Sequence, residues 1–194
     1  MDFIDSSFTK AVRSFVERIG QTLPFGLPEP VRLYLVGGSA MGFYVNERVS
    51  NDVDGIFSHR ILLSPEMTEI WQDERQEPRL LTMGTNFSEA LALVHPDYKE
   101  DSLLVGEFAS GRLLLHLLSP VDLAVTKIGR FSEVDRQDLC RLAEWVGLDP
   151  EAVESRAKEA LSHYIGQVKT IETHIELAKG IIEECGKPSS GPGY

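Results

Sequence analysis

The sequence predicts an α/β protein with a small mixed sheet of roughly four to six strands, flanking helices and a helical C-terminal extension. Near the N-terminus, apolar residues repeat at three- and four-residue spacing, which is typical of an amphipathic helix. Short apolar runs bounded by glycine, proline or serine recur through the middle of the chain and are typical of strands. The stretch 151–185 lacks proline and repeats its apolar residues at helical spacing, which predicts the extension.

The N-terminal elements follow from local pattern. Residues 7–23 are expected to form a helix, because Phe8, Val12 and Phe15 fall on one face, with Ser6 or Ser7 as the N-cap. Prolines and a glycine then predict a loop. The next expected elements are a buried strand at 31–36, a short helix at 40–45, a strand at 52–57 and a helix at 65–73.

The middle of the chain is expected to alternate between strands and helices. Ser119-Pro120 predicts a helix start, with proline at the first position and Asp122 in the first turn. Gly147 is expected to end the next predicted helix, at 133–146. The predicted strands are 80–83, 103–108 and 112–118, the segment 88–94 fits either a helix or a strand, and the predicted helices are 120–129 and 133–146.

The stretch 151–185 carries two series of apolar residues at seven-residue spacing, a heptad-like pattern. They are Leu161, Val168, Ile175 and Ile182, and Ala157, Tyr164, Ile171, Ala178 and Cys185. The pattern fits one long helix or a hairpin broken near Gly166, packed on its own domain. It also fits a surface for a second copy of the chain or for a partner protein. The predicted organisation is a domain at 1–150, the extension at 151–185 and a Gly/Ser/Pro-rich, disordered tail at 186–194.

Charge and cysteine content exclude several classes of protein. The 194 residues carry 19 lysines and arginines against 30 acids, a formal net charge of −11, which argues against a protein that coats duplex DNA. Cys140 and Cys185 form no CxxC pair, so neither a zinc site nor a disulfide framework is expected, and a reducing cytoplasm fits best. The N-terminus lacks a signal-peptide pattern, and no apolar run approaches the ~20 residues that a membrane span needs, so no membrane association is expected.

One local pattern suggests chemistry. Gly37 and Gly38 follow a predicted strand, where glycine lets the backbone turn sharply and approach a ligand, and Ser39 then begins a helix whose free N–H groups favour an anion. Asp52 and Asp54 are two apart on a predicted strand, so both carboxylates leave one face of the sheet. Such a pair suits Mg²⁺ together with substrate phosphates, although two solvent-facing aspartates would give the same pattern.

A Gly-Gly-Ser turn followed by Asp-x-Asp resembles the signature of the nucleotidyltransferase fold shared with DNA polymerase beta. The later segments SPVDLAVTKIGR at 119–130 and DRQDL at 135–139 resemble bacterial nucleotidyltransferase-like proteins close to the AbiEii toxin family. The resemblance covers roughly residues 31–146. It implies a nucleotidyltransferase-like mixed sheet and metal-dependent transfer of a nucleotidyl group from a nucleoside triphosphate to an RNA or protein acceptor, as a toxin-type enzyme with a cognate partner.

The resemblance also implies roles for individual residues. Asp52 and Asp54 would be catalytic and would hold Mg²⁺ or Mn²⁺, and Lys127 would neutralise phosphate charge. The residues that would bind the nucleotide are Gly37, Gly38, Ser39, Arg48 and Arg130.

The chain departs from the family where a third carboxylate is expected. Many members of the fold supply that acid from a neighbouring strand to complete a two-metal site. In the predicted strand 112–118 the polar residue is His116, which also fits a hydrogen-bonded core residue. The remaining candidates for the third acid are Glu107, Asp135 and Asp138. The alternative function is therefore a catalytically silent module of this fold that binds a nucleotide or a protein partner.

Overall fold

A computed structural model describes residues 3–45, 49–64, 66–84, 87–89 and 91–187. The fold is α+β, with six helices and one six-stranded mixed sheet among these residues, which confirms the predicted class. The chain divides into two compact units, one of residues 1–88 and 97–119 and the other of residues 89–96 and 120–194. The expected boundary at residue 150 differs from this division, because the helices that follow residue 120 pack with the C-terminal helices.

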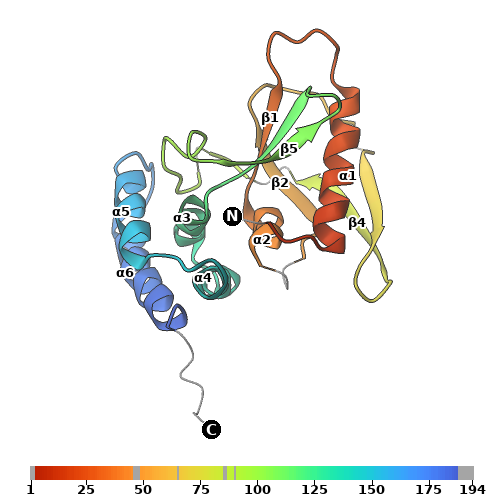
Figure 1. Ribbon diagram of the computed structural model, residues 1–194. Coiled ribbons are helices and arrows are strands. Elements are labelled where there is room, and N and C mark those ends of the chain that lie inside the picture. Colours follow the sequence, from red (N-terminus) through yellow and green to blue (C-terminus); the bar gives the residue numbers. More distant parts are fainter. Residues whose placement is uncertain (1–2, 46–48, 65, 85–86, 90, 188–194) are drawn as a thin grey trace. The chain divides into compact units, whose positions relative to one another are not determined.

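The first unit is built on a sheet with the strand order β3-β4-β2-β1-β6-β5 (Figure 1). Its strands are β1 (Val31–Leu35), β2 (Asp52–Phe57), β3 (Thr68–Gln72), β4 (Pro78–Gly84), β5 (Leu103–Phe108) and β6 (Leu113–Leu117). The pairs β1–β6 and β2–β4 are parallel and the other neighbours are antiparallel. The parallel pair β2–β4 sets Asp52 beside Thr82 and Asp54 beside Gly84.

Helix α1 (Ser7–Thr22) covers one face of this sheet. Ser6 caps it, because its hydroxyl accepts from the backbone N–H of Thr9 while the Thr9 hydroxyl accepts from that of Ser6. The apolar side of α1 is buried, and the ring of Phe8 lies 5.7 Å from that of Trp71 on β3. The sheet residues below α1 are fully buried aliphatics, among them Leu33, Val53, Leu81 and Leu115.

Strand alternation places a different set of side chains on the opposite face of the sheet. We call this the polar face, and it carries Tyr34, Asp52, Asp54, Thr82 and His116. The short helix α2 (Gly37–Tyr44) follows β1 and packs on β2 and on α1. It begins at Gly37, three residues earlier than expected.

The segment 65–73 was expected to be a helix, and this was wrong for its described part. It contains strand β3, which pairs with β4 in a hairpin. One tertiary and one local contact favour the extended form. Trp71 is buried against α1, and the Asp73 carboxylate accepts from the backbone N–H groups of Arg75 and Glu77 to close the turn. The described residues of 88–94 form neither a helix nor a strand.

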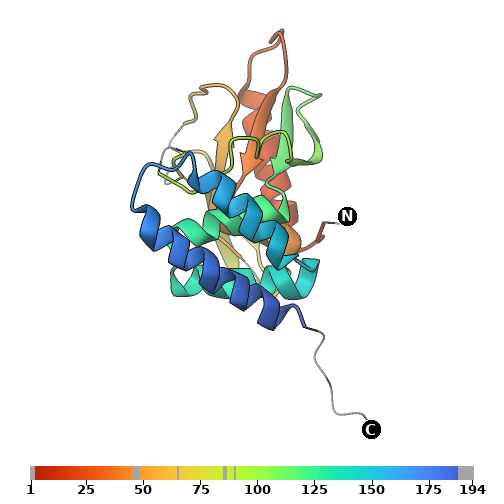
Figure 2. The same cartoon turned by 90° about the vertical axis from the view of Figure 1, so that its left-hand side faces the viewer.

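The second unit contains helices α3 (Pro120–Arg130), α4 (Glu133–Val146), α5 (Pro150–Leu161) and α6 (Val168–Cys185), seen together in Figure 2. The hairpin alternative for the C-terminal stretch is therefore correct, since the chain turns between α5 and α6. Within the chain the Leu161 series is not buried throughout, since Val168 is 41% exposed at the start of α6; contact of this residue with a second copy or a partner stays a prediction. The buried side of α6 consists of Ile171, Ile175, Ala178 and Ile182.

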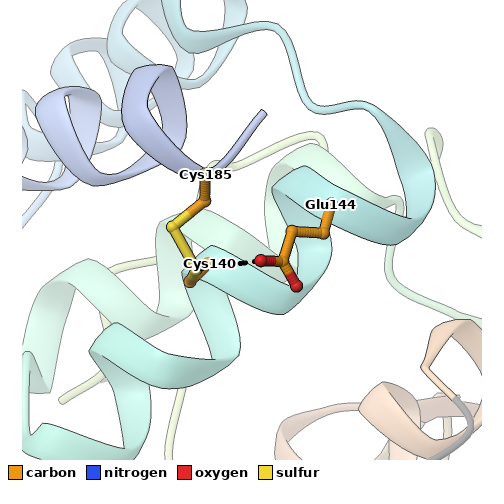
Figure 3. A group of neighbouring side chains, drawn as sticks. All are labelled: Cys140, Glu144 and Cys185. Atoms are coloured by element: carbon orange, nitrogen blue, oxygen red, sulfur yellow. Dashed lines mark hydrogen bonds between the residues drawn. A yellow bond between two sulfur atoms is a disulfide. The ribbon is translucent and has the colours of Figure 1, made fainter. Parts of the chain in front are cut away.

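Cys140 on α4 and Cys185 at the end of α6 form a disulfide, contrary to expectation (Figure 3). The sequence does not indicate this pairing, because the two cysteines are 45 residues apart and only the packing of α6 on α4 brings their Cα atoms to 5.3 Å. No helix in the described part of the chain has the length and apolar character to cross a membrane. The expected disordered tail lies outside the described residues from position 188 onward.

Candidate functional site

The turn between β1 and α2 is held against β2. Gly37 adopts φ +58°, a left-handed conformation that favours glycine. The backbone N–H of Val36 donates to the carbonyl of Asp54 at 3.0 Å, and the Ser39 hydroxyl donates to the carbonyls of Val36 and Asp54 at 2.9 and 3.0 Å. Ser39 is fully buried. Its hydroxyl therefore fixes the turn to β2, and only the backbone of this segment is left to face a ligand.

The N-terminus of α2 has no side-chain cap. The N-cap residue is Val36, whose side chain makes no capping hydrogen bond. The first N–H groups of a helix have no partner within the helix and attract anions. Anion binding at the first turn of α2, formed by Gly37, Gly38 and Ser39, stays a prediction, and the Asp54 carboxylate lies next to Gly37.

The Asp54 carboxylate occupies a space made by two glycines. A Cβ atom added at Gly37 would lie 2.9 Å from Asp54 Oδ2, and one added at Gly84 would lie 2.2 Å from Asp54 Oδ1. Both distances are shorter than any normal contact of a Cβ atom. The carboxylate thus lies between the β1–α2 turn and the end of β4, in a position that larger residues at 37 or 84 would close.

Asp52 lies on the same polar face as Asp54. Its Cβ atom would be 3.4 Å from a Cβ at Gly84, so both aspartates flank that glycine. The Thr82 hydroxyl donates to Asp52 Oδ1 at 2.9 Å, and among the described residues Asp52 has no cationic partner. Two carboxylates and a hydroxyl on neighbouring strands form a set of hard oxygen ligands, the kind that Mg²⁺ and Mn²⁺ prefer.

Glu107, a candidate for the third acid, is not brought to this pair. It lies on the edge strand β5, level with Leu114 on β6 and Arg32 on β1, whereas Asp54 lies beyond the other end of β1. Three strand spacings, roughly 14 Å, separate β5 from β2 even before the offset along the strands. The described residues of the first unit place no third carboxylate, histidine or cysteine in a cluster with Asp52 and Asp54.

His116 lies on the polar face and is a packed residue of the first unit. Its ring lies 5.2 Å from that of Tyr34, and its Nδ1 lies 3.1 Å from the Ser102 hydroxyl, which itself donates to the carbonyl of Lys99. Ser102 must therefore accept from Nδ1–H, which leaves Nε2 as a buried lone pair with no partner among the described residues. Burial, and to a lesser degree the charge of Arg32, lower the pKa of His116 and keep it neutral.

The remaining predicted residues belong to the second unit, where they form ion pairs. Lys127 is almost fully buried, and its Nζ lies 2.6 Å from Asp138 Oδ2 and 3.8 Å from Asp135 Oδ1. Arg130 donates twice to Asp135, at 2.7 Å each. Burial opposes ionisation of Asp135, but hydrogen bonds from Arg130 and Ser132 lower its pKa to about 2. Arg48 lies outside the described residues.

Sequence reasoning missed Thr82 and Gly84. Neither residue carries a recognisable local motif, and both reach the site only because β4 pairs in parallel with β2. It also missed Arg156, which donates to the buried Asp122 at 2.8 and 3.1 Å and so links α5 to the start of α3. The signal for that pair was an acid in the first turn of a helix whose buried residues are mostly apolar.

The comparisons with known proteins leave the family open. No family model matches the chain, and no curated protein matches it. The nucleotidyltransferase resemblance therefore stays an inference from the motifs and from the site geometry.

Proposed function

We propose that this chain is a metal-dependent nucleotidyltransferase, which moves a nucleotidyl group from a nucleoside triphosphate to an RNA or protein acceptor in the cytoplasm. The observation that carries the proposal is the position of the Asp54 carboxylate between Gly37 and Gly84. It joins the three parts that such a reaction needs: a glycine turn, a helix N-terminus and two acids on one sheet face.

The chemistry of the site supports an ion of the Mg²⁺ class. Asp52 and Asp54 offer carboxylate oxygens beside each other, and Thr82 orients Asp52 through Oδ1. The ion would neutralise charge on the triphosphate, as metal ions do in phosphoryl transfer. The protein's own contribution is to hold the phosphates at the first turn of α2, since backbone N–H groups placed in advance cost no reorganisation when charge develops.

The second candidate is a catalytically silent module of the same fold. It is favoured by one observation, the absence of a third carboxylate beside Asp52 and Asp54 in the described part of the first unit. Such a module would bind a nucleotide, or a protein partner or second copy. Exposed apolar residues on α6, Val168 and Leu177, are consistent with a contact surface there.

Radiolabelling tests the proposal directly. The purified chain is incubated with Mg²⁺ or Mn²⁺, each α-labelled nucleoside triphosphate in turn, and total RNA or protein extract as the acceptor. We expect label on one acceptor class, and a loss of about 10²–10³ in rate for Asp54→Asn, which keeps the size of the side chain but removes a charged ligand. Asp5→Asn, an exposed aspartate on the N-terminal segment, serves as the matched control and should keep the full rate.

The outcomes separate the two candidates. Equal labelling by the unmodified chain and by Asp54→Asn would remove Asp54 from the mechanism. No labelling by the unmodified chain, together with saturable nucleotide binding that Asp54→Asn weakens, would support the silent module.

A further inference from the structure

A group of metal-ligating side chains lies in the second unit, independent of the site proposed above. Cys140 and Glu144 are four residues apart on α4, so they share one helix face, and Cys185 ends α6 opposite them (Figure 3). The ligand atoms of the three residues all lie within 4.8 Å of one another. Glu144 is exposed and both cysteines are partly exposed, so solvent, a reductant and an ion can reach the group.

The Glu144 carboxylate is turned toward the sulfur atoms. Its Oε1 lies 3.7 Å from Cys140 Sγ, the approach marked in Figure 3. A disulfide sulfur has no hydrogen to donate, so this approach is a contact in the oxidised state and becomes a hydrogen bond only when Cys140 is a thiol. Among the described residues Glu144 has no cationic partner, which distinguishes it from Glu154 on α5, bound by Lys158 and Lys179.

The distances match the requirements of a tetrahedral ion. Zinc binds thiolate sulfur at ~2.3 Å and carboxylate oxygen at ~2.0–2.2 Å, so two such ligands lie about 3.5 Å apart in a tetrahedral site. The Glu144 oxygen is already near that distance from Cys140. The Cα atoms of Cys140 and Cys185 lie 5.3 Å apart, so side-chain rotation alone lets two reduced sulfurs face one ion.

We propose that the reduced chain binds one thiophilic divalent cation of the Zn²⁺ class through Cys140, Cys185 and Glu144, with water as the fourth ligand. A dithiol reductant supplies two electrons and two protons to the disulfide and is itself oxidised to a disulfide. The ion then displaces both thiol protons and is held by two thiolates and one carboxylate. Disulfide and metal exclude each other, because the sulfur electron pairs that bind the ion form the S–S bond in the oxidised state. Thiolate ligands select zinc over magnesium, so this site and the Asp52–Asp54 site take different ions.

Cobalt titration tests the proposal. The chain is reduced with a dithiol, desalted without oxygen and titrated with Co²⁺, then back-titrated with Zn²⁺. We expect one equivalent of Co²⁺ with a sulfur-to-metal charge-transfer band, displacement by Zn²⁺ but not by excess Mg²⁺, and no band from the oxidised chain. Zn²⁺ should also raise the melting temperature of the reduced chain.

Variants identify the ligands. Cys185→Ser should abolish the band, and Glu144→Gln, which keeps both cysteines and can be purified in the oxidised, folded form, should weaken Zn²⁺ binding at least about tenfold. Glu184→Gln changes an exposed acid beside Cys185 and should bind normally. The proposal is overturned by the absence of a charge-transfer band in the reduced chain, by unchanged binding in Cys185→Ser, or by equal affinity of Glu144→Gln and Glu184→Gln.

Discussion

Lys127 is buried between two carboxylates of α4, those of Asp135 and Asp138. Its side chain is 5% exposed and that of Asp138 is fully buried, so neither charge can be hydrated. Burying two charges costs free energy that their attraction and hydrogen bonds must offset, and the loss of one partner leaves the other charge uncompensated. Compensation of these buried carboxylates is therefore enough to explain the position of Lys127, and no contact with a substrate phosphate is needed to explain it.

Lys127→Met should destabilise the folded chain by about 3–5 kcal/mol, because it leaves Asp138 buried without its ammonium partner. Chemical denaturation measures the change. Lys10→Met, which removes an exposed pair with Asp5 at 3.2 Å, is the control and should cost less than about 1 kcal/mol. A Lys127→Met chain as stable as the unmodified one would show that the pair contributes nothing.

Asp135 predicts a pH dependence of stability. Its pKa is about 2 in the folded chain against 3.8 for an ordinary aspartate. Since the folded value is the lower one, the stabilisation is fully present above about pH 4 and is lost as the pH falls toward 2. The difference corresponds to about 2 kcal/mol. The free energy of unfolding of Asp135→Asn should therefore lie below that of the unmodified chain at neutral pH, and the gap should close on acidification.

Glu133→Gln is the control for this pH series. Glu133 lies in the same turn of α4, and a hydrogen bond from Arg136 lowers its pKa as well. Its side chain is 68% exposed, so solvent screens this pair and its replacement should change the pH profile much less than Asp135→Asn does. A gap between Asp135→Asn and the unmodified chain that stays constant down to pH 2 would contradict the assignment to Asp135.

At the scale of elements, the site depends on how closely β1, α2, β2 and β4 approach one another. Glycine at 37 and 84 leaves room for the Asp54 carboxylate, and the Ser39 hydroxyl ties the α2 turn to the backbone of β2. An added methyl group would have to displace the carboxylate or open the strands. A side chain at position 37 or 84 would therefore both move the Asp54 carboxylate and lower the stability of the fold around it.

Gly37→Ala should lower the stability of the first unit by at least about 1–2 kcal/mol, because φ +58° is unfavourable for alanine and its Cβ would meet Asp54 Oδ2. It should also lower any transferase rate measured on the folded fraction. Gly180→Ala is the matched control: its Cβ would meet nothing within 4 Å inside α6, so about 0.5–1 kcal/mol of stabilisation is expected. Thermal unfolding of both variants gives the comparison, and equal effects would refute the close approach at Gly37.

At the scale of the whole molecule, different interactions stabilise the two units. The first has a sheet with an aliphatic face under α1, and the second has four helices with a covalent link between α4 and α6. That link closes a loop with a sequence separation of 45, which removes conformational freedom from the unfolded chain. The stability of the second unit should accordingly respond to redox conditions, and that of the first should not.

Reduction in the presence of a chelator should destabilise the second unit by about 4 kcal/mol, the chain-entropy value for a loop of this length. Hydrogen exchange resolved by peptide measures it, with faster exchange expected in α4 to α6. The peptides of β1, β2 and β6 are the internal control and should be unaffected. A Cys140→Ser/Cys185→Ser chain should behave like the reduced chain in the presence of the chelator, and full protection of α6 without the disulfide would contradict the prediction.

Local pattern was sufficient to predict α1, β1, β2, β4, β5, β6, α3 and α4, because the period of apolar residues and the caps lie within each segment. It also predicted that Asp52 and Asp54 share a face beside the Gly37 turn, since strand alternation is a local property. The β3–β4 hairpin, Thr82, Gly84, the division between the units and the Cys140–Cys185 disulfide were decided only by tertiary structure. Each depends on which distant segments pair or pack, as Trp71 does against α1 and α6 against α4. Contacts of that kind leave no periodic trace in a single sequence.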